Sequence, residues 1–185
     1  GDREALAVAD AARTAGLPAL VLGLAPDGRD RDGVAWVRTA RREAFPVLAR
    51  HAIGTLGVRR IVVVRDDTMY GRASAEAFAQ AAKAAGGEVA ATLVLEPGRA
   101  AASAIAERVA ATLATGREGT ECPRDAVFLA MDAGAARGLV PYLEFAGVTG
   151  RGSGAQARCE GATVLGTALW NDPDLLARSG VALEG

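Results

Sequence analysis

Residues 59–77, RRIVVVRDDTMYGRASAEA, contain the pattern that decides the fold. Residues 61–65 hold a β-branched run with the density of a strand buried on both faces. A polar turn at residues 66–68 follows directly, and a helix is expected to begin near Gly71. Because ligands bind at the carboxyl ends of the strands in an open parallel sheet, the loop of residues 66–70 is the first place to look for function.

Strand and helix patterns alternate along the rest of the chain. Such alternation predicts an α/β fold, a Rossmann-like open parallel sheet with helices on both faces. Loops are predicted at residues 25–33 and 149–157, which are polar and rich in glycine. Strands are predicted at residues 17–22, 34–37, 61–65, 88–95, 126–131 and 163–170, and helices at residues 3–15, 42–57, 72–85, 100–115, 133–145 and 172–178.

Composition limits the classes of function. The chain has 185 residues, 50% of them hydrophobic, without an uninterrupted apolar run of membrane-spanning length. A net charge of -1 and scattered arginines argue against a nucleic-acid partner. A further apolar segment starts just before Gly185, which predicts that the sequence is a piece of a longer protein.

Side chains able to bind a ligand follow three of the predicted strands. A tyrosine ring offers apolar contact area and a hydroxyl group, and a carboxylate can receive the ammonium group of a ligand. A tryptophan at the rim of a cleft can stack on a ring. Because the carboxyl ends of parallel strands meet at one edge, we expect these side chains to face one cleft. The candidate ligand-binding residues are Asp66, Asp67, Thr68, Tyr70, Asp132, Ala133, Trp170 and Asn171.

Each of these groups also has a purely structural interpretation. Asp67 or Thr68 could cap the following helix, because Asp and Thr side chains accept the free amide hydrogens of a helix start. Asp132 could cap the next helix, and for this residue the cap is the favoured interpretation. Trp170 could equally pack under a neighbouring helix. The sequence leaves these alternatives open.

The other residues with distinctive chemistry predict no catalytic group, no metal site and no cofactor. His51 is the only histidine, and no second His or Cys lies at ligand spacing from it. Gly150, Gly152 and Gly154 precede a strand, whereas the glycines of a dinucleotide-binding loop follow a strand and lead into a helix. The set of Asp, Thr and Lys that marks phosphoacceptor receiver domains is also missing from the later strand ends.

Cys122 and Cys159 each lie just before a predicted strand. Neighbouring strands are about 4.8 Å apart, so the loops that enter them would meet at the amino edge of the sheet, where a disulfide is sterically possible. The loop-entropy model gives this bond about 4 kcal/mol of stabilisation at most. We favour the disulfide, which fits an oxidising, exported location, over two free thiols in a cytosolic protein.

Residues 56–98 resemble the second lobe of type I periplasmic binding proteins, the fold of the leucine/isoleucine/valine receptors. The family shows a Gly-x-(Lys/Arg)-(Arg/Lys) entry to a hydrophobic strand, then Asp-x-x-Tyr-Gly, then a helix with a Phe and a Gly-Gly before the next strand. The "DAVFL" and "VLGT" strands further along also match. The ending "VLGTALW" is similar to the penicillin-binding-protein activator lipoproteins, a branch of the same fold. The residues that match the first pattern are Gly57, Arg59, Arg60, Asp67, Tyr70, Gly71, Phe78, Gly86 and Gly87.

The resemblance implies a non-enzymatic, extracytoplasmic solute-binding domain, periplasmic or at the cell surface and lipid-anchored in the full-length protein. It would hold a small polar or peptide-like ligand, such as an amino acid, between two lobes for an ABC-type transporter or sensor. Residues 1–38 are expected to form part of the first lobe and the crossover, and residues 39–185 the second lobe. At residues 24–28, LAPDG stands where amino-acid receptors carry Ser and Ala-Thr, so their ligand clamp is not matched.

Two other functions remain as alternatives. An envelope interaction module would regulate cell-wall synthesis by contacting a cell-wall synthase instead of a membrane permease. A small α/β enzyme would need a nucleophile with a base, a metal cluster or a phosphate loop, and the sequence offers none of these. An exposed sheet edge also leaves a homodimer open.

Overall fold

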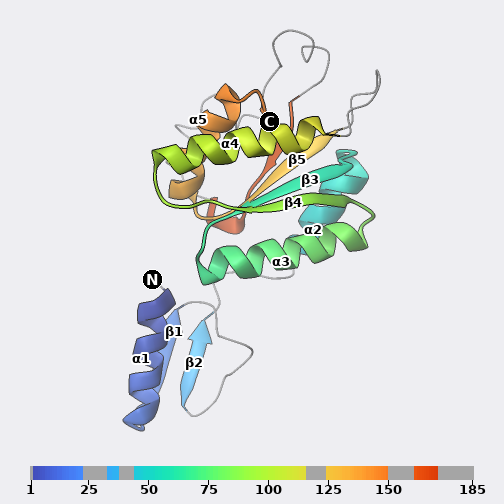
Figure 1. Cartoon of the computed structure of the whole chain (residues 1–185). Helices are drawn as coiled ribbons and strands as arrows, with labels where there is room; N and C mark the ends of the chain where they lie inside the picture. The colour runs from blue at the N-terminus through green and yellow to red at the C-terminus, as the bar shows by residue number, and fades with distance from the viewer. Residues whose placement is uncertain (1, 23–32, 38–43, 116–123, 150–160, 171–185) are drawn as a thin grey trace.

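The computed structural model describes residues 2–22, 33–37, 44–115, 124–149 and 161–170 (Figure 1). The helix predicted at residues 172–178 and most of the two predicted loops lie outside these residues. The elements, in chain order, are α1 (Asp2–Thr14), β1 (Ala19–Leu22), β2 (Val34–Val37), α2 (Ala44–Arg50), the π-helix η2 (His51–Thr55), β3 (Arg60–Arg65), α3 (Met69–Ala84), β4 (Glu88–Val94), α4 (Arg99–Ala114), β5 (Asp125–Ala130), α5 (Ala133–Phe145), β6 (Thr163–Leu165) and the 3-10 helix η4 (Ala168–Trp170).

The main sheet has four parallel strands in the order β4-β3-β5-β6. The predicted open parallel α/β sheet is therefore confirmed. β3 lies between β4 and β5, and its register with β5 runs from Arg60 opposite Asp125 to Arg65 opposite Ala130. Because the two strands end level with each other, the loops that follow them start side by side.

Helices cover both faces of this sheet, with α2 and α3 on one face and α4 and α5 on the other (Figure 1). Side chains from one face of β3 pack with Phe78 of α3 and Phe128 of β5, whose stacked rings lie 3.9 Å apart between centroids. Side chains from the other face pack with Val109 of α4 and Leu139 of α5. This double burial explains the continuous β-branched run. The first set is Ile61 and Val63, and the second is Val62 and Val64.

Arg60, the first residue of β3, ties the end of α4 to the sheet. Its guanidinium donates to the carbonyl oxygens of Thr112 at 2.9 Å and Leu113 at 3.4 Å. Carbonyl groups in the last turn of a helix have no partner within the helix and carry its negative dipole end, so a cation there is favourable. Arg60 thus connects the amino end of β3 to the carboxyl end of α4.

A second, two-stranded parallel sheet pairs β1 with β2, and α1 packs on it through Ala9, Val21 and Val34. The strand predicted at residues 17–22 is present as β1, but the expectation from its apolar sequence that it is buried is wrong, because Leu17 is 59% exposed and Leu20 is 70% exposed. Side chains alternate between the two faces of a strand, and within the described residues only one face of this sheet is covered.

The strand predicted at residues 163–170 is also too long. β6 ends at Leu165, and the apolar residues that suggested a longer strand form η4. Thr167 precedes η4 and holds its turn: the carbonyl oxygen of Thr167 accepts from the amide of Trp170, and its hydroxyl oxygen accepts from the amide of Leu169. Side-chain hydrogen bonding to the local backbone has replaced the strand ladder.

Candidate functional site

Asp66 and Thr68 organise the loop that leaves β3. The Oδ1 atom of Asp66 accepts from the Thr68 amide at 3.2 Å and from the Thr68 hydroxyl at 2.6 Å. The Thr68 hydroxyl oxygen in turn accepts from the amide of Gly71 at 2.9 Å, so Thr68 is the N-cap of α3. Of the two residues proposed as caps here, Thr68 therefore has that role and Asp67 does not.

Gly71 brings this loop against the end of β5. A Cβ atom added to Gly71 would lie 2.9 Å from the carbonyl oxygens of both Ala130 and Asp66, and would collide with the carboxylate of Asp66. Only a residue without a side chain allows this approach. Tyr70, which precedes Gly71, is half-buried, and its hydroxyl group has no hydrogen-bond partner among the described residues.

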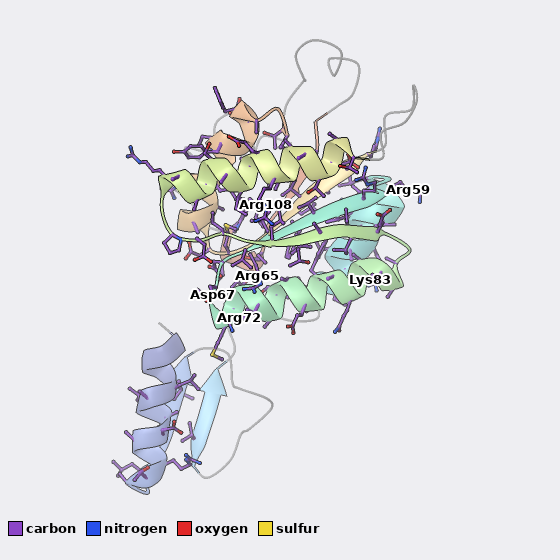
Figure 2. All side chains as sticks on the ribbon, in the orientation of Figure 1. Arg59, Arg65, Asp67, Arg72, Lys83 and Arg108 are labelled. Carbon is purple, nitrogen blue, oxygen red and sulfur yellow. The ribbon has the colours of Figure 1, made fainter. Side chains whose placement is uncertain are left out.

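Asp67 lies between two arginines at the start of α3 (Figure 2). Its Oδ1 atom is 2.9 Å from Nη2 of Arg72 and 3.4 Å from Nη1 of Arg65. The carboxylate is 62% exposed, so solvent screens both ion pairs. Neither arginine was predicted as a partner of Asp67, although their opposite charges lie only two and five residues from it in the sequence.

Asp132 occupies the corresponding position after β5. Its Oδ1 atom accepts from the amide of Ala135 at 2.8 Å, which confirms the favoured interpretation of this residue as the N-cap of α5. Ala133 is only 5% exposed, so its side chain belongs to the core more than to the surface. The carboxylate of Asp132 remains exposed to solvent.

Trp170 reaches the same edge from η4. Its indole Nε1 atom donates to the carbonyl oxygen of Met131 at 3.1 Å, and its ring packs against the apolar cluster under α4 and α5. The packing alternative therefore describes this ring in the structure. Asn171, Cys122 and Cys159 lie outside the described residues, so the predicted disulfide stays a prediction, although β5 and β6, the strands that these cysteines precede, are neighbours.

The three predicted segments are contiguous at the carboxyl edge of the sheet. The loop after β3 touches the last carbonyl of β5 through Gly71, and the turn after β6 touches Met131. His51 lies apart from this edge, exposed on η2. Across the described ranges, no group of three or more His, Cys, Asp and Glu side chains could hold a metal ion. Among the same residues, no helix has the length and apolar character needed to cross a bilayer.

A parallel sheet covered on both faces by helices, with polar loops gathered at its carboxyl edge, defines the open-sheet α/β class of fold. Residues 1–175 match the family model described as "Periplasmic binding protein", and the chain therefore belongs to that family. The resemblance to type I periplasmic binding proteins is confirmed. No curated protein matches the chain.

Solved structures share the fold at low sequence identity. A protein from Rhodospirillum rubrum, described as a branched-chain amino acid ABC transporter, has a TM-score of 0.62 at 22% identity over 97% of this chain and 46% of its own. A solute binding protein of an ABC transporter from R. palustris, in complex with benzoate, has a TM-score of 0.64 at 20% identity over 96% of this chain and 44% of its own. An ABC transporter substrate-binding protein from Desulfitobacterium hafniense, in complex with Leu, has a TM-score of 0.53 at 20% identity over 78% and 41%. The chain thus spans less than half the length of these structures.

Proposed function

We propose that the chain is part of a non-enzymatic, extracytoplasmic receptor that binds a small polar solute between two lobes for an ABC-type transporter or sensor. Membership of the periplasmic binding protein family supports this role and this location. The names of the similar structures add support, since they describe ABC transporter proteins in complex with Leu or benzoate. Both of these ligands are small carboxylic acids, so amino acids and aromatic acids are the first solutes to test.

The carboxyl edge of the main sheet forms one wall of the proposed site. The observation that carries the proposal is the contact between Gly71 and the end of β5, which places the loops after β3 and β5 side by side. Tyr70 is the central ligand-binding residue of the proposal, because its half-buried ring offers apolar contact area and its hydroxyl is unpaired among the described residues. Asp67 and Asp132 contribute exposed carboxylates at the rim.

The division of the chain into two lobes belongs to the same proposal. Residues 1–38 would supply part of the first lobe and residues 39–185 the second, with hinge closure over the solute. The separate two-stranded and four-stranded sheets support this division. A membrane permease would be the partner of the loaded receptor.

A thermal-shift screen of the full chain against amino acids, short peptides, aromatic carboxylates and nucleosides tests the proposal. A solute at one hundred times its dissociation constant adds about 2.7 kcal/mol to the free energy of unfolding. We expect a hit that is lost in Tyr70→Ala. A stable protein without any hit across these classes would contradict solute binding.

The second candidate function is an envelope interaction module that contacts a cell-wall synthase. This candidate is favoured by the hydrogen bonds that two of the candidate carboxylates already make within the protein. Asp66 accepts from the hydroxyl of Thr68, and Asp132 caps α5. Such a module needs no solute. A pull-down assay with a purified cell-wall synthase tests this candidate. Equal capture by the wild type and by Tyr70→Ala, with no stabilising solute in the screen, would favour it.

A further inference from the structure

The carbonyl oxygen of Met131 accepts two side-chain hydrogen bonds from the turn after β6. Nε1 of Trp170 donates at 3.1 Å, and the hydroxyl of Thr167 donates at 3.3 Å. Met131 is fully buried and Thr167 is 6% exposed. A buried carbonyl left without a donor is costly, so these two hydrogen bonds satisfy a group that water cannot easily reach.

These bonds stand where strand pairing has stopped. β6 pairs with β5 only as far as Leu165 opposite Phe128. β5 continues to Ala130, and the chain passes through Met131 before α5 begins. Within the described residues, side chains from η4 therefore take over the role of the missing strand partner at the carboxyl edge.

The absence of a side chain at Gly166 leaves room for the indole ring of Trp170. A Cβ atom on Gly166 would lie 2.9 Å from Cε2 of Trp170 and closer still to two other ring atoms. The ring thus lies directly over the backbone that follows β6. The turn is also held from within, because the amide of Trp170 donates to the carbonyl of Thr167 at 3.0 Å. The position of Nε1 is set by this packing.

We propose that Trp170 and Thr167 are positioning residues that clamp the turn after β6 to the loop after β5 and so hold the start of α5 in place. Met131 directly precedes Asp132, the N-cap that accepts from the amide of Ala135. A shift of Met131 would move this cap and its carboxylate. The inference rests on the proposed function for its meaning, since Asp132 is part of the proposed wall of the solute site.

Amide hydrogen exchange in the full chain tests the clamp without any solute. Trp170→Phe keeps an aromatic ring over Gly166 but removes the N–H donor, and Thr167→Val removes the hydroxyl at similar shape. Loss of one hydrogen bond of about 1 kcal/mol corresponds to a roughly fivefold change in an opening equilibrium. We expect the amides of Ala135 and Ala136 to exchange about fivefold faster in either variant.

Two controls separate positioning from general loosening. The amide of Gly71, capped by Thr68 at the start of α3, should exchange at the wild-type rate in the same samples. Thr115→Val, which matches Thr167→Val but lies at the end of α4, should leave the exchange rates of the amides at both caps unchanged. Equal acceleration at Gly71 and Ala135, or no acceleration at either, would overturn the clamp.

A solute titration then connects the clamp to binding. With any solute found in the screen, the dissociation constant of Trp170→Phe should rise several-fold, while Thr115→Val should bind as the wild type does. Faster exchange at Ala135 with unchanged affinity would overturn the role of the clamp in the solute site. Failure to find a solute would count against the proposed function alone, because the exchange measurement still decides whether the clamp exists.

Discussion

The hydroxyl of Thr68 donates to Oδ1 of Asp66 at 2.6 Å while its oxygen accepts from the amide of Gly71 at 2.9 Å. A single hydroxyl group thereby joins the end of β3 to the first turn of α3. The backbone that carries Tyr70 is fixed between these two bonds. The same short segment serves both the stability of the helix and the geometry of the proposed site.

Thr68→Ala removes this cap. We expect a loss of about 1 kcal/mol in the free energy of unfolding, the usual cost of an N-cap deletion, and a melting temperature about 2–4 °C lower. Thermal and urea unfolding measure the change. Thr115→Ala is the matched control, because the exposed hydroxyl of Thr115 donates to the carbonyl oxygen of Ala111 in the preceding helix. Equal losses in the two variants would show that the cap has no special role.

Gly71→Ala and Gly138→Ala form a pair with opposite expected signs. At Gly71 the new methyl group meets the carbonyl oxygens of Ala130 and Asp66, so we expect a loss of more than about 2 kcal/mol. At Gly138, inside α5, a Cβ atom meets nothing within 4 Å, and alanine should stabilise the helix by about 0.5–1 kcal/mol. Urea unfolding of both variants measures the difference. A stabilising Gly71→Ala would contradict the close packing of the two loops.

Arg60→Ala leaves the last carbonyl groups of α4 without their charged donor. We expect a loss of about 1–2 kcal/mol, since hydrogen bonds from charged groups are stronger than neutral ones. Arg108→Ala, on the exposed surface of α4, should change stability by less than about 0.5 kcal/mol. Chemical denaturation of the two variants compares the sites, and similar losses would refute the specific role of Arg60.

The ion pair between Asp67 and Arg72 should contribute little to stability. Both side chains are more than half exposed, at 62% and 54%, so we expect a coupling energy of about 0.2–1 kcal/mol. A double-mutant cycle with Asp67→Asn and Arg72→Gln measures this coupling. A larger value that resists added salt would show that the pair is shielded from solvent.

The predicted Cys122–Cys159 disulfide can be tested by mass alone. Intact mass under non-reducing conditions should be lower by two hydrogens than the mass of the reduced chain. Reduction should then destabilise the protein by up to about 4 kcal/mol. An unchanged mass on reduction would exclude the bond.

Local patterns predicted much of the fold. α5 begins and ends as predicted at Ala133 and Phe145, because Asp132 caps its start and Gly147, at φ +71°, follows its end. β3 was visible because burial on both faces leaves an unbroken apolar run. These features depend on residues adjacent in sequence.

Features set by distant partners were harder to predict. The apolar side chain of Leu20 predicts a core position, but its exposure depends on what covers the β1–β2 sheet. The apolar side chains of residues 168–170 predicted a strand. In the structure, hydrogen bonds of the Thr167 hydroxyl to the Met131 carbonyl and the Leu169 amide accompany the 3-10 helix η4 instead. The choice between Asp67 and Thr68 as a cap depended on side-chain geometry that the sequence does not encode in its periodicity.

The most direct test of the account is a calorimetric titration of the full chain with the solute that stabilises it most, using Tyr70→Phe beside Tyr142→Phe. Each variant removes one hydroxyl group, at the carboxyl edge in the first case and on α5, next to the apolar cluster, in the second. The account predicts a dissociation constant roughly tenfold higher than that of the wild type for Tyr70→Phe and an unchanged dissociation constant for Tyr142→Phe. Equal affinity for both variants and the wild type would contradict the placement of the solute at this edge.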